Sequence, residues 1–167
     1  MSSLMEYLEK IRENRGIMAD LRCALADSKK HRAYPYLGYL KGIGEDFKAR
    51  SVQVLAGLYA THPPKSDKPV EGNMGTVCYK MLSDDERKDY SKNPDPVSKR
   101  FQHLLAAKEE EIFDRLIRLV NYAKSKEIPV NYPQIEQDLK DWEYQSERVK
   151  TRWAKSFWAP NVKEEED

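Results

Sequence analysis

VNYPQIEQDLKDWEYQSERVKTRWAKSFWAP, residues 130–160, is the stretch of the chain that decides its fold. Two amphipathic helix patterns lie in it, joined by a short polar step, and the Asn-Tyr-Pro at its beginning is typical of a helix start. Trp142, Trp153 and Phe157 fall at helical spacing, where aromatic side chains are more often core than platforms for stacked bases. The stretch therefore predicts two helices that bury an aromatic face.

Basic residues mark another face of the second pattern. Arg148, Arg152 and Lys155 recur at i, i+4 and i+7, so they share one side of a helix. A basic face beside an aromatic face can hold a phosphate backbone while the helix packs. The simpler interpretation is a surface helix with a solvated charged side, because charged faces usually provide only solubility. The residues alone leave both interpretations open.

Helical spacing of apolar residues extends outward from this stretch through most of the chain. Leu4, Leu8 and Ile11 form one stripe, and the serines that precede them are good N-caps. Further stripes run over residues 47–59 and 112–123. Asp95 as N-cap and the proline after it form a strong helix start near the middle of the chain. No segment shows the sustained alternation of a strand.

Glycine and proline mark the expected ends of helices. Gly16 is expected to break the first helical segment, and Gly42 and Gly44 to form a turn between helices. His62-Pro63-Pro64 ends the longest early stripe. Residues 65–75 contain a proline, two glycines and almost no apolar residue, which predicts a loop, followed by a short helix over 76–82.

These patterns predict an all-α protein built as two small helical bundles packed as one compact protein. The expected division is an N-terminal bundle over residues 1–64, a linker loop over 65–75, a C-terminal bundle over 76–160 and an acidic tail over 161–167. Apolar residues make up 40% of the 167 residues, which is enough for a core of this size.

Charge is distributed unevenly along the chain, although the formal net charge is only +1. Residues 22–50 carry seven basic and three acidic side chains, and residues 146–160 carry four basic and one acidic. The tail from Lys163 to Asp167 has a net charge of −3 and hides part of this asymmetry. Two isolated cysteines, a polar N-terminus and the lack of a long apolar run favour a cytoplasmic protein without a membrane segment.

Residue types that carry catalysis or bind metal do not form a recognisable motif. His31, His62 and His103 are far apart and lack ligand spacing, so no metal site is expected. The Gly-Ile-Gly at 42–44 lacks the strand, the third glycine and the Gly-Lys-Ser/Thr ending of a nucleotide loop. Three glutamates at 109–111 are interpreted as a solvated first helical turn. We expect no cofactor and no enzyme, although a triad formed only in space would escape a sequence motif.

Further basic positions flank the expected apolar faces. Arg115 and Arg118 border the stripe that begins at Ile112, and Lys99 and Arg100 lie near a helix start, where the helix dipole attracts phosphate. Arg22 is either a rim ion-pair residue or a phosphate contact, and Lys80 lies in the short helix beside the linker. Together they indicate binding to a nucleic-acid backbone rather than base readout, because no recognition helix is visible.

Three groups of residues carry a resemblance to a known family. They are Gly16-Ile17-Met18-Ala19-Asp20-Leu21-Arg22; the helical pair FQHLL at 101–105 and LIRLV at 116–120; and VNYP at 130–133 with Leu139, Trp142 and RWAKSF at 152–157. Together they span most of the chain. On these residues the sequence resembles the CasB family, the small subunit of the type I-E CRISPR surveillance complex, Cascade.

The resemblance implies an all-helical, non-catalytic subunit of a ribonucleoprotein. Its partners would be the other Cascade subunits, a second copy of itself, CRISPR RNA, and the target and non-target DNA strands, with stabilisation of the R-loop as its role. The contact candidates that it implies, by matching position, are Arg22, Lys80, Lys99, Arg100, Arg115, Arg118, Arg148 and Arg152. The alternative function is a helical adaptor that binds only protein, its charged faces merely solvated.

Overall fold

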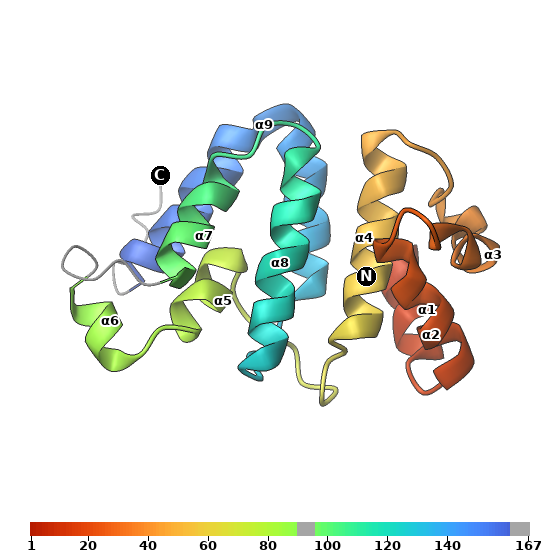
Figure 1. Ribbon diagram of the computed structural model, residues 1–167, viewed down its shortest axis with the longest axis horizontal. Helices are drawn as coiled ribbons and strands as arrows, with labels where there is room; N and C mark the ends of the chain where they lie inside the picture. Colours follow the sequence, from red (N-terminus) through yellow and green to blue (C-terminus); the bar gives the residue numbers. More distant parts are fainter. Residues whose placement is uncertain (90–95, 161–167) are drawn as a thin grey trace.

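The computed structural model describes residues 1–89 and 96–160, and every regular element within those residues is helical, so the predicted all-α class is confirmed (Figure 1). The α-helices are α1 (Ser3–Ile11), α2 (Arg15–Arg22), α3 (Tyr34–Leu37), α4 (Phe47–Thr61), α5 (Met74–Lys80), α6 (Asp84–Lys88), α7 (Pro96–Leu105), α8 (Glu111–Ser125) and α9 (Tyr132–Trp158). Three short 3-10 helices, Cys23–Leu25, Lys30–Arg32 and Gly38–Leu40, connect α2 to α4.

The first two helices begin at polar side chains that accept backbone hydrogen bonds. Ser2 caps α1 as predicted, its hydroxyl oxygen accepting from the Met5 N–H at 3.1 Å. The predicted break at Gly16 is wrong, because the Asn14 side chain accepts from the Ile17 N–H at 3.0 Å and starts α2 before the glycine. Gly16 therefore lies inside the first turn of α2.

Helix α4 is the central element of the fold, with nearly all of its residues from 52 to 60 buried. Gly57 allows the 3-10 helix Cys23–Leu25 to approach closely, because a Cβ there would lie 2.6 Å from Leu25. On the opposite side, Phe47 contacts Phe113 of α8 at 4.9 Å between ring centroids. The predicted turn before α4 is confirmed, and buried Gln53 donates from Nε2 to the carbonyls of Gly42 and Gly44 at 2.9 Å each.

The segment predicted as a linker ends earlier than expected. Asn73 caps α5, which begins at Met74 and ends at Lys80, so the short helix predicted over 76–82 starts two residues sooner. Gly75 lies inside this helix, where a Cβ would be only 2.0 Å from the carbonyl oxygen of Trp153. Glycine is needed here for the close approach of α5 to α9 rather than for a loop.

One hydrophobic core runs from Leu4 to Phe157 and includes residues of both halves. The division into an N-terminal bundle, a linker loop and a C-terminal bundle remains a prediction. Pro96 begins α7 as expected, whereas the predicted cap Asp95 lies outside the described residues. The prediction of a helical turn over 109–111 is wrong at Glu109, whose φ of 48° is left-handed, and α8 starts only at Glu111.

Helix α9 bends back on itself at Gln145, whose φ of −141° and ψ of 47° are not helical. We call Tyr132–Tyr144 its first arm and Ser146–Trp158 its second arm. The Trp153 Nε1–H donates to buried Asp138 at 2.8 Å, although 15 residues of straight helix would span about 22 Å. The arms therefore fold together, one behind α8 and the other behind α7, which confirms the two predicted helical patterns (Figure 1).

Each arm of α9 packs against a different part of the molecule. In the first arm, Tyr132 donates to the carbonyl oxygens of Leu58 and His62 at 3.0 and 2.6 Å, which fastens the arm to the end of α4. In the second arm, Ser156 accepts from Asn73 Nδ2 at 2.9 Å, beside the close approach at Gly75. Trp142, Trp153 and Phe157 are buried, as predicted for core aromatics.

Candidate nucleic-acid interface

A groove of about 720 Å³ lies between α7 and α8. Its lining residues are Lys99, Arg100, His103, Arg115, Arg118, Leu119, Asn121, Tyr122 and Ser125. Four of the eight predicted contact residues, Lys99, Arg100, Arg115 and Arg118, therefore come together here. No carboxylate is among the lining residues that the structure describes, so the groove is strongly basic.

The helical spacing of buried apolar and exposed basic residues on α7 and α8 produces this basic surface. On α7, Val97 and Phe101 are buried, and Lys99 and Arg100 between them are exposed and face away from the core. On α8, Leu116 and Leu119 are buried in the same way. The outward faces of the two helices lie next to one another, which places cations from both elements along one groove.

Arg115 is held firmly by the protein itself. Its Nη1 donates to the carbonyl oxygen of His103 at 2.7 Å, and its Nη2 pairs with Glu111 at 2.7 Å. Only 17% of the Arg115 side chain is exposed. This side chain joins the end of α7 to the first turn of α8, and it neutralises the Glu111 carboxylate.

Arg100 is oriented by an aromatic ring. Its guanidinium carbon lies 4.7 Å from the ring centroid of Tyr122, a cation–π contact across the two helices. Lys126 Nζ lies 5.1 Å from the same centroid and donates to the carbonyl oxygen of Met81 at 2.9 Å. The contact limits the freedom of Arg100 while its donors remain able to reach phosphate.

Lys99 and Arg118 are exposed, and neither has an ion pair or hydrogen bond within the part of the chain that the structure describes. An exposed cation without a protein partner has the most to gain from an approaching anion. These two side chains are therefore the best-placed direct contacts in the groove.

The other four predicted residues lie outside the groove. Lys80 and Arg148 are exposed on α5 and on the second arm of α9. Arg22 donates from Nη1 to the carbonyl oxygen of Ala60 at 3.2 Å, at the end of α4. Arg152 lies 3.5 Å from Asp141 of the first arm. Arg22 and Arg152 thus have contacts that support the fold, whichever further role they have.

The bend of α9 contains a buried carboxylate, Asp138. It accepts from Trp153 Nε1 at 2.8 Å and from Gln134 Nε2 at 2.9 Å. Burial raises the pKa of Asp138, and these hydrogen bonds together with the charge of Arg152 oppose the increase. The group is part of the core that holds the two arms together.

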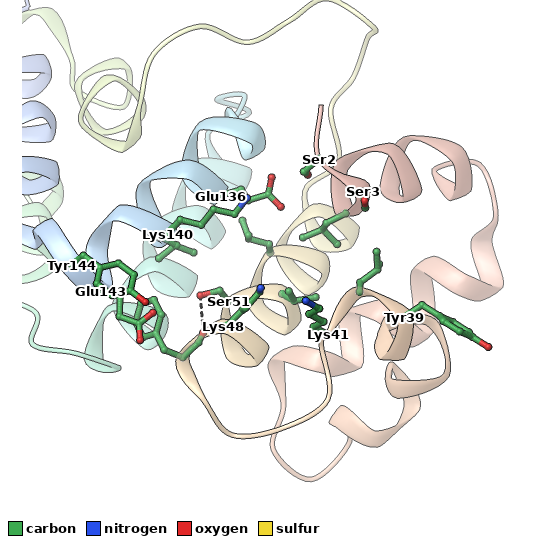
Figure 2. Close-up of a pocket in the computed structure, with 16 residues that line it drawn as sticks. Ser2, Ser3, Tyr39, Lys41, Lys48, Ser51, Glu136, Lys140, Glu143 and Tyr144 are labelled. Carbon is green, nitrogen blue, oxygen red and sulfur yellow. Dashed lines mark hydrogen bonds between the residues drawn. The ribbon is translucent and has the colours of Figure 1, made fainter.

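A second cavity, of about 450 Å³, lies between α4 and the first arm of α9 (Figure 2). Its charged lining is mixed, because Lys41, Lys48 and Lys140 are accompanied by Glu136 and Glu143. Two exposed aromatic residues, Tyr39 and Tyr144, also belong to its lining. Compared with the α7–α8 groove, this cavity has less net positive charge.

Three polar residues of the groove were not among the predicted contacts: His103, Asn121 and Ser125. Helical spacing could have indicated them, since His103 follows Lys99 by four residues and Asn121 follows Arg118 by three. Each carries groups that can hydrogen-bond to phosphate or sugar oxygens, as nucleic-acid contacts commonly do.

Residues 1–89 and 96–160 contain neither a metal-binding cluster nor a membrane-spanning helix. No group of three or more His, Cys, Asp or Glu side chains there is arranged to hold a metal ion. None of the helices in those residues is both long and apolar enough to cross a membrane.

Solved structures of similar fold include CasB proteins from three organisms. CasB from Thermus thermophilus has a TM-score of 0.68 at 24% identity, with 95% of this chain and 99% of that chain covered. CasB from M. ruber has a TM-score of 0.71 at 23% identity, covering 96% and 94%. CasB from Thermobifida fusca has a TM-score of 0.62 at 20% identity, covering 93% of each chain. At these identities the likeness shows the fold.

The sequence itself identifies the family. No match was found among curated proteins. The family model described as CRISPR-associated protein Cse2 matches residues 18–158, which is most of the chain and includes both α7 and α8. The match confirms the resemblance seen in the sequence, and the chain belongs to the Cse2, or CasB, family of small, non-catalytic subunits of the type I-E CRISPR complex Cascade.

Proposed function

We propose that this Cascade subunit binds nucleic-acid backbone through the α7–α8 groove and thereby stabilises the R-loop. The R-loop consists of the displaced non-target DNA strand and the guide–target hybrid. The observation that carries the proposal is the convergence of Lys99, Arg100, Arg115 and Arg118 on a groove with no carboxylate among its described lining residues. Such a surface attracts phosphate without selecting a base.

Backbone binding suits the energetics of R-loop formation. Replacing a DNA duplex by a guide–target hybrid is close to balanced, so modest contacts between protein and backbone can shift the equilibrium. Each phosphate neutralised by Lys or Arg releases counterions, which gives an affinity that falls as salt rises. Since the guide RNA supplies sequence specificity, the subunit needs no base-reading helix.

The four cations of the groove have different roles in this proposal. Lys99 and Arg118 contact phosphate directly, because neither is paired among the described residues. Arg100 contacts phosphate from a position that Tyr122 restricts. Arg115 is a positioning residue that holds α7 against α8 through His103 and Glu111.

Membership of Cascade implies assembly with other Cas subunits and CRISPR RNA. We extend the proposal to a second copy of this chain in the complex and to both DNA strands. In the same proposal Arg22, Lys80, Arg148 and Arg152 are secondary contacts, reached by the backbone beyond the groove. The protein would act in the cytoplasm, where the complex meets invading DNA.

An adaptor that binds only protein is the second candidate, and the α4–α9 cavity favours it. Tyr39 and Tyr144 are 102% and 83% exposed at this cavity, and tyrosine is enriched at protein interfaces. Both functions can coexist, because the cavity and the groove have no lining residue in common.

The test is target double-stranded DNA binding by the reconstituted guide-RNA complex, with and without this chain, across a salt series. We expect omission to weaken binding and to reduce the slope of log affinity against log salt, since phosphate contacts are lost. Equal affinity and equal slope would overturn the proposal and leave the adaptor function.

A further inference from the structure

A third cavity, of about 730 Å³, lies between α1, the loop at residues 64–70 and the start of α9. We call it the α1–α9 cavity. Met5 and Glu9, on one face of α1, contribute to its lining, and Val130 and Pro133 add apolar wall beside the start of α9. Its volume is in the range of ligand-binding cavities. It has no lining residue in common with the α7–α8 groove or the α4–α9 cavity, so it belongs to neither site already described.

Tyr59 of α4 lines this cavity, and its hydroxyl is buried without a hydrogen bond to the described residues. Only 3% of the residue is exposed. Burial raises the pKa of Tyr59, so the phenol keeps its proton at neutral pH and is available as a donor. Because a buried donor without an acceptor destabilises a fold, most such groups have a partner. The hydroxyl therefore marks the point at which an occupant would supply an acceptor.

The neighbouring Tyr132 shows a hydroxyl that the fold does satisfy. The ring centroids of Tyr59 and Tyr132 are 5.4 Å apart. Tyr132 donates to the carbonyl oxygens of Leu58 and His62 at 3.0 and 2.6 Å, whereas Tyr59 has no such acceptor. Two tyrosines in one part of the core thus differ in whether the protein itself provides an acceptor.

Charged side chains of the cavity lie around the Tyr59 hydroxyl. After burial, the positive charge of Arg12 has the largest effect on the pKa of Tyr59 and opposes its rise. Arg12 Nη2 donates to Asp67 of the loop at 2.8 Å, and the Asp67 side chain is 94% exposed. An exposed ion pair contributes little to stability, so the loop can draw Arg12 away from the hydroxyl at low cost.

The charges of the lining cancel one another. Glu9 and Asp67 are acidic, and Arg12 and Lys68 are basic. Phosphate would meet two carboxylates here, whereas it meets none among the described lining residues of the α7–α8 groove. Methionine in the remaining wall adapts to apolar side chains of different shape. The lining fits an uncharged occupant that has an apolar body and a carbonyl oxygen, a combination that a peptide segment provides.

We propose that the α1–α9 cavity binds a short uncharged peptide segment of a protein partner. An apolar side chain of that segment packs beside Met5 and Val130. A main-chain carbonyl oxygen of the segment accepts from the Tyr59 hydroxyl when Arg12 moves outward with Asp67. This inference concerns a site apart from the α7–α8 groove, so it holds or fails independently of the proposed binding to nucleic acid.

The state of the Tyr59 hydroxyl is tested on the full chain without any probe. Tyr59→Phe removes only the oxygen and should leave the melting temperature unchanged or slightly raised, because no hydrogen bond is lost. Tyr132→Phe is the matched control; it loses two hydrogen bonds and should lower the melting temperature by about 3–6 °C. A comparable fall in both variants would mean that the Tyr59 hydroxyl already has a partner, such as a bound water, and would overturn the inference.

Binding is tested with N-acetyl-leucine N-methylamide, an uncharged probe with one apolar side chain and two amide carbonyls. It is titrated into the full chain carrying ¹³C-methyl methionine. Met1 and Met5 line the cavity, and the other methionines provide reference signals. We expect saturable shifts of Met1 and Met5 with a dissociation constant of about 1–10 mM. Tyr59→Phe should weaken binding about three- to tenfold, and Tyr132→Phe less than twofold.

Related probes identify the chemistry of the occupant. N-acetyl-glycine N-methylamide lacks the apolar side chain and should bind at least about fivefold more weakly. N-acetyl-leucine, which ends in a carboxylate, should also bind more weakly, because Glu9 and Asp67 repel it. Tighter binding of this carboxylate would mean that Arg12 captures small anions and would overturn the uncharged peptide. If the leucine amide gives no saturable shift at Met1 or Met5, the site itself is overturned.

Discussion

On the second arm of α9, Lys150 and Arg152 contact the protein's own carboxylates and rings, whereas two basic side chains of the α7–α8 groove have no such partner among the described residues. Lys150 lies 3.5 Å from Glu147 and 5.2 Å from the Trp142 ring centroid, and Arg152 lies 3.5 Å from Asp141. Lys99 and Arg118 are exposed. The difference indicates that replacing a paired cation changes stability, and replacing an unpaired one changes binding.

The largest loss of stability is expected from a substitution at Gly75, where α5 lies against the second arm of α9. A Cβ there would lie 2.0 Å from the carbonyl oxygen of Trp153, and backbone atoms cannot move aside as a side chain can. We expect Gly75→Ala to lower the free energy of unfolding by about 3 kcal/mol in denaturant titration, because it separates α5 from the second arm.

Gly16→Ala is the matched control for this prediction. Gly16 lies in the exposed first turn of α2, and the nearest atom to an added Cβ is Asn14 Oδ1 at 3.5 Å. Alanine there should be neutral or stabilising by up to about 1 kcal/mol. Equal unfolding free energies for Gly75→Ala and the wild type would show that the second arm is not held by this close approach.

Binding should respond most to the unpaired cations. Lys99→Glu with Arg118→Glu should lower the target-DNA affinity of the reconstituted complex by about 10- to 100-fold at low salt, since two phosphate contacts become repulsions. The melting temperature of the isolated chain should stay close to that of the wild type, because neither side chain holds another element.

Lys48→Glu with Lys140→Glu in the α4–α9 cavity makes the same change in charge on exposed helical positions. We expect this pair to change affinity less than threefold once the general effect of charge is included. A comparable loss from both pairs would mean that net charge, and not the groove, determines binding.

Arg152 is a paired cation, so its replacement should change stability more than DNA binding. Arg152→Ala removes the 3.5 Å contact with Asp141 and the packing of the side-chain stem across the bend of α9. Because the pair is partly exposed, we expect a loss of only about 1 kcal/mol in stability and little change in DNA affinity. Arg152→Lys should recover part of the stability; a large affinity loss without destabilisation would identify Arg152 as a contact instead.

Helical periodicity was sufficient to predict the all-α class, the break within residues 130–160 and the burial of Trp142, Trp153 and Phe157. Those features depend on local spacing, which a single sequence contains. Boundaries were predicted less well where a polar side chain overrides a glycine, as when Asn14 starts α2 before Gly16.

Contacts between distant segments could not be predicted from the same patterns. Arg115 reaches the His103 carbonyl only because α7 and α8 pack together, and Arg152 reaches Asp141 only because α9 folds back. The sequence indicated a basic face on each helix. Whether two faces meet in a groove, and which cations are already paired, depends on tertiary geometry.

The smallest effect that we predict concerns Asp138, at the junction of the two arms. Burial raises its folded-state pKa above the unfolded value, so its contribution to stability is fully present below the unfolded pKa. That contribution is lost as pH rises through the folded pKa. Asp138→Asn keeps an oxygen to accept from Trp153 and has no carboxylate to ionise.

The unfolding free energy of the wild type minus that of Asp138→Asn should therefore decrease as pH rises from the acidic range, and become constant above the folded pKa. At neutral pH we expect the two proteins to differ by less than about 1 kcal/mol, since the carboxylate's hydrogen bonds offset part of its burial. Denaturant titrations at several pH values measure this difference. An increase with pH would mean that Trp153, Gln134 and Arg152 stabilise the ionised carboxylate more than burial disfavours it. Asp138 would then be a stabilising charge, like the carboxylates that pair with Lys150 and Arg152 on the second arm.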